Sequence, residues 1–274
     1  MIRLFYIEWI KLRKYRAFQI LTVLYFLIVV VVTSSGMFFL EYLKSKGAEF
    51  KGIDPTILPI YQFPYLWQHL VFVAARLKIL LAFLIILSIT NEVSYKTLRQ
   101  NIIDGMTRTE FILSKLSMVF VLSLINTLLV FVIGLVTGLI YSDHTDLAAV
   151  FGNMDYLGAF FLNVFSFLVF TLLISLIIKR TGVVIIFLGM YSVIIEPIVA
   201  LILSNAPFVP PFYAKLVPFL PRQAITNLLP NPFSQYILQE MQNYISFRDV
   251  AIAGGEMLLF IGLIFLLLRR KGNV

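Results

Sequence analysis

The stretch Leu116–Tyr141 reads LSMVFVLSLINTLLVFVIGLVTGLIY and carries no charged side chain over its 26 residues. A helix rises about 1.5 Å per residue, so about 20 apolar residues cross a hydrocarbon core roughly 30 Å thick. The stretch is therefore predicted to be a membrane-spanning helix. Gly134 and Gly138 within it form a Gly-x-x-x-Gly pattern, which permits close helix approach. We interpret the pattern as packing inside one bundle, with a dimer contact as the alternative.

Five other segments have the same length and apolar character: Phe18–Leu40, Leu66–Thr90, Leu157–Ile178, Val183–Ser204 and Val250–Leu268. The composition agrees, because 60% of the 274 residues are hydrophobic and only 13% are charged, whereas soluble domains carry about 25% charged residues. The predicted fold class is all-α, a polytopic membrane protein with six transmembrane helices. We find no linker or repeat, so residues 1–274 are predicted to form a single transmembrane domain.

The distribution of lysine and arginine sets the orientation. The ends and loops on one predicted side hold fourteen of the 22 basic residues but only four of the 14 acidic ones. Cytoplasmic loops carry such an excess, so both termini are predicted to be cytoplasmic. The basic residues fall in short clusters between apolar blocks, and for this reason we expect no nucleic-acid partner despite the net charge of +8.

Residues 1–16, before the first predicted span, have two faces at helical spacing. The apolar face carries Ile2, Phe5, Trp9 and Leu12, and the polar face carries Arg3, Glu8, Lys11 and Lys14. This pattern is typical of a helix that lies in the inner membrane interface. Phe5, Trp9, Lys11 and Lys14 are its predicted lipid anchors. A plain basic extension of the first span is the alternative interpretation.

The external segment 205–249 holds seven of the eleven prolines yet stays apolar. Proline interrupts helices, so this segment is not expected to span the membrane as one rod. Two interpretations stay open. In the first, short helices return into the outer leaflet against protein, where irregular backbone is tolerated. In the second, the segment caps the spans from outside.

The connection 91–115 carries the strongest local signal. Sparse apolar residues predict a short helix, and Gly105 suits the left-handed residue that ends such a helix. Thr107 and Glu110 then form a Thr-x-x-Glu capping box at the start of the next span. The predicted product is a helix, a sharp stop and a new helix. We call this connection the elbow, and we expect it to be rigid and exposed to the cytoplasm.

The elbow resembles the cytosolic segment of ABC-2-type permeases, the membrane subunits of type-2 ABC exporters. The residues that carry the resemblance are Glu92, Thr97, Arg99, the run Ile103–Arg108 and Lys115. The layout of the whole chain is also similar, with an interfacial helix, six spans and a long external loop before the last span. Coupling to an ATPase is expected from Glu92, Thr97, Arg99, Asp104, Gly105, Thr107, Arg108 and Glu110.

The resemblance implies two partners, a separate ABC ATPase subunit and a second permease chain in a homo- or heterodimer, with the substrate path between the permeases. No Gly-x4-Gly-Lys-Ser/Thr phosphate-binding loop occurs in the sequence, so this chain is expected to bind no cofactor, and ATP and Mg are expected in the partner. The expected place is a bacterial inner membrane, among lipids, and the expected role is not enzymatic. An amphipathic drug, a peptide or a lipid-linked molecule would each suit apolar walls.

Four ionisable residues fall within the predicted spans: Arg76, Lys78, Glu196 and Glu256. A charge near the middle of a membrane costs about 2.5–3.5 kcal/mol on insertion scales, so we expect these four to pair as one cluster. Two roles stay open, namely pinning the helices together and lining the substrate path. Pro197 is predicted to bend the fifth span beside Glu196.

Two other functional classes compete with the permease. An ion-coupled secondary transporter could use the intramembrane charges, although the sequence shows no inverted repeat and no paired broken helices. A membrane scaffold or an integral-membrane enzyme is the other alternative. With no cysteine, two histidines and no metalloprotease or serine-nucleophile motif, the sequence predicts no metal site and no catalytic residues.

Overall fold

The computed structural model describes residues 8–11, 13–47, 59–94, 100, 105–205, 210–233 and 244–270. Every regular element in these ranges is helical. Five helices are long and apolar enough to cross a membrane, and a sixth span is present if one bent pair of helices is counted together. The predicted fold class is confirmed: the chain is an all-helical, multi-pass membrane protein.

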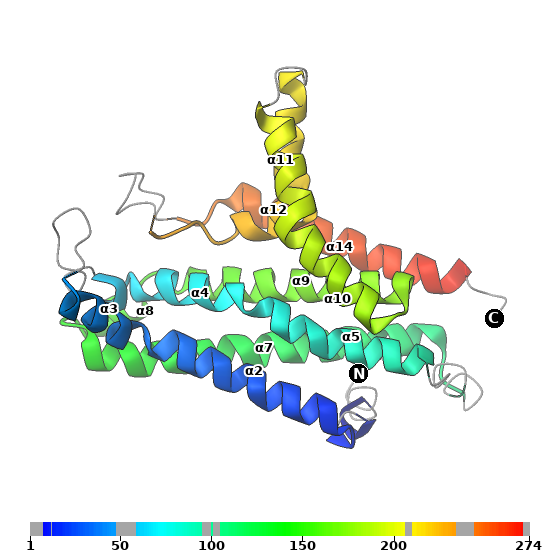
Figure 1. The fold of residues 1–274 in the computed structure, drawn as a ribbon, viewed down its shortest axis with the longest axis horizontal. Coiled ribbons are helices and arrows are strands. Elements are labelled where there is room, and N and C mark those ends of the chain that lie inside the picture. The colour runs from blue at the N-terminus through cyan, green and yellow to red at the C-terminus, as the bar shows by residue number, and fades with distance from the viewer. Residues whose placement is uncertain are drawn as a thin grey trace.

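Figure 1 shows the helices in chain order, most of them along one long axis. They are α2 (Arg16–Ser34), α3 (Gly36–Ser45), η2 (Pro59–Tyr61), α4 (Leu66–Arg76), α5 (Lys78–Ser94), α7 (Arg108–Tyr141), α8 (Leu147–Phe151), α9 (Asp155–Ile178), α10 (Thr181–Met190), η3 (Tyr191–Ile195), α11 (Glu196–Asn205), η4 (Pro211–Phe219), α12 (Pro221–Asn227) and α14 (Phe247–Arg270). The elements η2 and η4 are 3-10 helices, and η3 is a π-helical turn.

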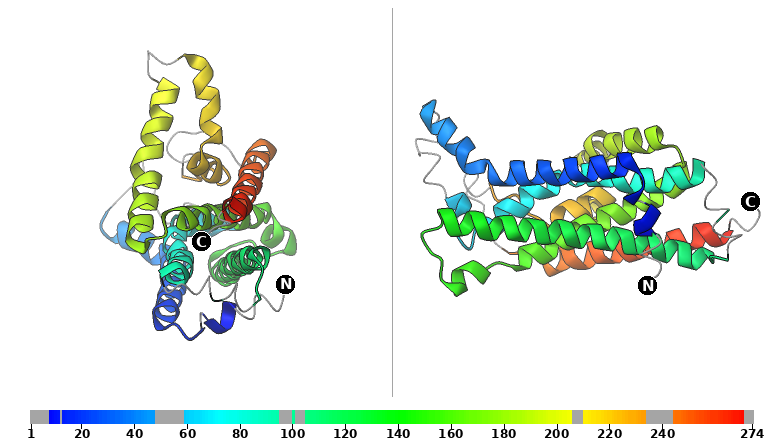
Figure 2. Two further views of the ribbon diagram at one scale, coloured as in Figure 1. Left: turned by 90° about the vertical axis from the view of Figure 1, so that its right-hand side faces the viewer. Right: turned by 90° about the horizontal axis from the view of Figure 1, so that it is seen from below.

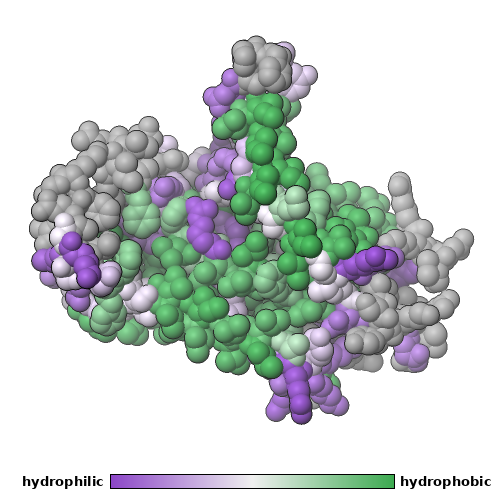
Figure 3. All heavy atoms as spheres, viewed as in Figure 1, coloured by the Kyte–Doolittle hydropathy of each residue, from purple (hydrophilic) through white to green (hydrophobic). Residues whose placement is uncertain are grey.

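Helix α9 is the centre of the bundle. It packs against α4, α5, α7 and α14, and its side chains Phe160, Val164 and Leu168 are fully buried. About two thirds of its span is buried (67%), against 17% for the spans at 181–205 and 247–268. The outer helices turn apolar side chains such as Val132 and Val136 of α7 outward. Hydrophobic residues consequently cover most of the described surface on the face shown in Figure 3, as in a lipid-facing protein.

Residues 8–11 and the end of α14 lie toward the same end of the bundle, which we call the inner end (Figures 1 and 2). The helices α5, α9 and α14 finish there, and α2, α7 and α10 begin there. This arrangement is the one expected of an even number of spans. This is the end that the excess of basic residues predicts to face the cytoplasm.

The Gly-x-x-x-Gly pattern of α7 is a contact within the chain. A Cβ atom added to Gly134 would enter the ring of Trp67, and one added to Gly138 would enter the ring of Phe63. Trp67 also stacks on Phe131 and donates a hydrogen bond to the Val150 carbonyl at 2.8 Å. The pattern therefore serves internal packing of α4 against α7, as predicted.

The second predicted span is broken in its middle. The helices α4 and α5 meet at Leu77 with a bend of 43°. The Leu77 N–H donates to the Ala74 carbonyl at 3.0 Å, a tighter turn than an α-helix makes. Arg76 and Lys78 stand on either side of the break.

The fifth predicted span is also interrupted, directly before Pro197. Glu196 donates its N–H to the Tyr191 carbonyl, five residues back, in the π-helical turn η3. Pro197 has no N–H to donate to Val193, which explains why the regular ladder fails at this place. Helix α11 then leaves the bundle and lies beside η4 (Figures 1 and 2). We call α11 and η4 together the arm.

The proline-rich segment forms η4 and α12, as far as residue 233. Its helix α12 returns to the bundle and packs against α9 and α14, with Ala224 and Ile225 buried. The Asn163 side-chain amide donates to the Ile225 carbonyl at 2.5 Å. Asn163 lies eight residues into α9, about 12 Å from its start. Helix α12 therefore lies alongside the bundle rather than beyond its outer end.

Candidate functional site

The end of the elbow has the geometry that its sequence predicts. Gly105 has φ +96°, in the left-handed region that favours glycine. The Thr107 hydroxyl accepts the Glu110 N–H at 3.2 Å, and the Glu110 carboxylate accepts the Thr107 N–H at 2.8 Å, so the capping box is complete. Thr97, Arg99 and Asp104 lie outside the described residues, as does the predicted short helix apart from Gln100.

A group of four charges, three of them buried and Lys11 partly exposed, lies where the elbow joins the bundle. Lys115 donates to the Glu8 carboxylate at 2.6 Å and pairs with the Glu92 carboxylate at 2.9 Å. Lys11 lies 3.3 Å from Glu92 and 3.6 Å from Glu8. We call these four residues the inner charge network. The charges of its two acids and two bases balance, which offsets the cost of burying the Lys115 ammonium in an interior of low dielectric constant.

The inner charge network joins three parts of the chain. Glu92 lies near the end of α5, and Lys115 lies near the start of α7. They therefore lie at the two ends of the elbow, one on each helix. Glu8 belongs to the N-terminal segment. Serine hydroxyls add two contacts, from Lys115 to Ser88 at 3.1 Å and from Ser114 to Glu8 at 3.3 Å. The two ends of the elbow are thus held together through buried, charge-assisted hydrogen bonds.

Sequence reasoning missed this network because it placed Glu8 and Lys11 on a solvated face. Glu8 instead points into the bundle and is 1% exposed. The available signal was Lys115 itself, which stands between Phe111, Ile112 and Met118 on the start of an apolar helix. A lysine in that position calls for a buried acidic partner.

The predicted lipid anchors differ in their surroundings. Trp9 is 47% exposed, so its ring faces out of the molecule at the inner end. Lys14 is exposed, whereas Lys11 turns toward Glu92. Phe5 lies outside the described residues.

Two further contacts tie helix ends together at the inner end. Arg108, the first residue of α7, donates to the Leu268 carbonyl of α14 at 3.1 Å. The hydroxyls of Thr90 in α5 and Thr181 in α10 lie 2.7 Å apart. With the inner charge network, these contacts link α5 to α7 and α10, and α7 to α14.

The predicted pairing of the four intramembrane charges is wrong. Arg76 and Lys78 form no ion pair with Glu196 or Glu256, all four of which lie in described ranges. Lys78 donates to the Asn163 side chain at 2.6 Å, and the Arg76 guanidinium lies 4.4 Å from the centre of the Phe72 ring. The charges are satisfied separately, Lys78 by the Asn163 side chain and Glu196 by backbone N–H groups of α12.

The two acids have other surroundings. The Glu196 carboxylate accepts the backbone N–H groups of Arg222 and Gln223, at 2.8 and 2.6 Å, in the first turn of α12. The first N–H groups of a helix lack partners inside it, so they stabilise a carboxylate as a cation would. One oxygen of Glu256 is buried and has no hydrogen-bond partner among the described residues.

No group of three or more histidine, aspartate or glutamate side chains in the described ranges is placed to hold a metal ion. Comparison of the chain with models of known protein families gives no match, and comparison with curated proteins gives none either.

Proposed function

We propose that this chain is the membrane-spanning permease subunit of an ATP-driven exporter of the ABC-2 type. It would act with a separate ATPase subunit, which binds ATP and Mg, and with a second permease chain in a bacterial inner membrane. The chain itself performs no chemistry. The observation that carries the proposal is the anchored elbow, a cytoplasmic connection whose flanking helices are joined by the inner charge network.

The anchoring is what coupling to a motor requires. A connection that hung loosely from two helices would absorb a push by bending. Here the Gly105 turn and the capping box fix how the chain enters α7, and Lys115 fixes α7 to α5 through Glu92. A displacement of the elbow therefore moves α5 and α7 together. Helix α5 runs 17 residues, about 25 Å, from the elbow to the break at Leu77.

Affinity purification in mild detergent tests the proposal. We expect the full chain to co-isolate an ATPase from its native membrane. Replacing residues 104–108 with a Gly/Ser linker of equal length should abolish co-isolation, and Arg99→Glu should weaken it. A matched Gly/Ser replacement of residues 142–146, in the loop between α7 and α8 at the opposite end, should leave it intact.

Each variant must first elute from gel filtration like the parent chain. A folded parent that brings down no ATPase, or a 104–108 linker variant that retains it, would contradict the proposal.

The ion-coupled transporter remains the second candidate because of the two interrupted spans. The break at Leu77 and the π-helical turn η3 lie near intramembrane charges, and broken helices form the ion and substrate sites of many secondary transporters. Transport in inverted vesicles separates the two. The permease requires ATP and tolerates a protonophore, whereas an ion-coupled transporter stops when the protonophore is added.

A further inference from the structure

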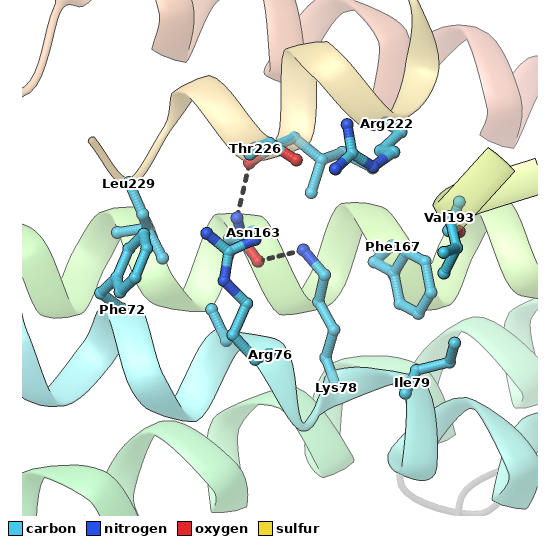
Figure 4. A pocket seen from close by; sticks show the side chains of 13 residues that line it. Phe72, Arg76, Lys78, Ile79, Asn163, Phe167, Val193, Arg222, Thr226 and Leu229 are labelled. Carbon is cyan, nitrogen blue, oxygen red and sulfur yellow. Dashed lines mark hydrogen bonds between the residues drawn. The ribbon is translucent and has the colours of Figure 1, made fainter. Parts of the chain in front are cut away.

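A cavity of ≈ 250 Å³ lies beside the break between α4 and α5. It is lined by residues of α4, α5, α9, the π-helical turn η3 and α12 and is open on one side (Figure 4). Three basic side chains line it, Arg76, Lys78 and Arg222. The remaining lining is largely apolar and includes Phe72, Ile79, Phe167, Val193, Ile225 and Leu229. We call this space the basic cavity.

The basic cavity gathers positive charge. Among the described residues, no aspartate or glutamate lines it, and none lies within ion-pair distance of the three basic groups. Glu196 is the acid that the chain places next to α12, but its two oxygens accept the backbone N–H groups of Arg222 and Gln223. Lys78 and Arg222 are partly buried and Arg76 is exposed. Three like charges that face one space repel one another, and an anion that enters relieves the repulsion.

The basic groups keep hydrogen-bond donors for a ligand. Lys78 has three donors, of which one is used on the Asn163 oxygen at 2.6 Å, and its ammonium lies 5.1 Å from the centre of the Phe167 ring. Asn163 is held in place because its amide donates to Ile225. The Arg76 guanidinium stacks on Phe72 and leaves its donor edge unused by the described residues. Figure 4 shows Arg76, Lys78 and Arg222 reaching into the same space from two sides.

The surroundings of the cavity select a ligand with an apolar part. In Figure 3 a hydrophilic area interrupts the hydrophobic surface between the bundle and the base of the arm. The π-helical turn η3, from which the arm starts, exposes apolar side chains, among them Val193 at 70% and Ile194 at 48%. A small, fully hydrated anion would gain nothing from this apolar surface, whereas an acyl or alkyl chain would.

We propose that the basic cavity binds the headgroup of an anionic amphiphile, whose apolar chain lies along the base of the arm. Phosphate suits the site best, because guanidinium groups bind it through paired hydrogen bonds and the lysine adds a further charge. Binding goes beyond the proposed function and requires neither an ATPase nor a second chain. Only the role of the amphiphile as the exported substrate rests on the proposed function.

Fluorescence titration of the full chain in dodecyl maltoside tests the site. The probes are NBD-labelled phosphatidic acid and, with the same chains, NBD-labelled phosphatidylcholine. We expect saturable binding of the phosphatidic acid probe, with a Kd that rises about tenfold or more in Arg222→Gln and in Lys78→Gln. Arg222→Lys should keep most of the affinity. The control Arg248→Gln removes an exposed cation of α14 and should bind like the parent.

Lys78→Gln removes the ammonium that donates to Asn163, which affects folding as well as binding. Each variant is therefore compared with the parent by gel filtration. Arg222 is only half-buried and forms no side-chain hydrogen bond in the described ranges, and it keeps the test valid if Lys78→Gln fails to fold. Equal affinity for the two probes would overturn the proposal. Unchanged affinity in a folded Arg222→Gln protein would overturn it as well.

Competition distinguishes the sources of the anion. Displacement of the probe by dioctanoyl phosphatidylglycerol identifies a bilayer phospholipid as a ligand, and displacement by dodecyl phosphate identifies a single-chain amphiphile. Displacement by inorganic phosphate at the same concentration would refute the need for an apolar chain. Because these titrations use the chain alone, their failure is separate from a failure to co-isolate an ATPase.

Discussion

Removing the buried cation of the inner charge network tests whether the network stabilises the inner end. The change is Lys115→Met, which keeps the length of the side chain and deletes its charge. The Lys115 side chain is 2% exposed and that of Glu8 is 1% exposed, so solvent cannot replace the lost partner. After the change, the remaining basic neighbour of Glu8 among the described residues is Lys11, at 3.6 Å.

The expected cost follows from this geometry. Removing one partner of a buried ion pair costs about 3–5 kcal/mol, against about 0–1 kcal/mol for an exposed pair. Because Lys11 still offers partial compensation, we expect a loss near the lower limit, about 3 kcal/mol. The double change Glu8→Gln with Lys115→Met leaves Glu92 paired with Lys11 at 3.3 Å. It should recover about 2 kcal/mol of the loss, since no unpaired buried charge remains.

Unfolding of the purified chain in mixed micelles, driven by sodium dodecyl sulfate and followed by far-ultraviolet circular dichroism, measures these differences. Lys14→Met is the matched control, because Lys14 is exposed at the same end of the bundle, and it should change the unfolding free energy by less than about 0.5 kcal/mol. If Lys115→Met costs no more than Lys14→Met, the network does not hold the helices as described. The same follows if the double variant loses as much free energy of unfolding as Glu8→Gln and Lys115→Met lose together when each is made alone.

Three smaller predictions use the same unfolding measurement. Gly134→Ala should lower the free energy of unfolding by about 1–3 kcal/mol because the new methyl group meets the Trp67 ring, whereas Gly158→Ala, with open space, should not lower it. Gly105→Ala should lose about 1–2 kcal/mol, since alanine resists a φ of +96°, and an unchanged value would refute the strain. Thr107→Ala should lose about 0.5–2 kcal/mol with faster hydrogen exchange in the first turn of α7, and unchanged exchange there would speak against the cap.

The spans and the end of the elbow were predictable because their signals are local. An apolar run longer than about 20 residues has few structures other than a transmembrane helix, and Gly105 and Thr107 act on their own backbone. The ends of the spans were less well predicted. Helix α7 begins at Arg108 rather than at Leu116, because residues 108–115, which include the charged Arg108, Glu110 and Lys115, are helical as well.

The partners of the charges could not be predicted, because they depend on where distant segments meet. The cost of burying a charge suggested that Lys78 belongs to one cluster with Glu196, but a carboxylate is satisfied equally by the free N–H groups of α12. The sequence allowed short helices of the proline-rich segment to return against protein, but it did not indicate that one of them begins at Glu196. Lys115 likewise pairs with Glu8, which lies more than a hundred residues away in the sequence. The apolar neighbours of Lys115 indicated that it needed a partner, but not which one.

The π-helical turn η3 fits one extra amino acid into a helix that would otherwise continue without interruption. Each residue of an α-helix advances about 100° around the axis, so deleting a single residue from 191–195 would rotate everything that follows by about that angle. Glu196 would then face away from Arg222 and Gln223, and α12 would lose the carboxylate at its start. The extra residue in η3 thus determines the direction in which the Glu196 side chain points.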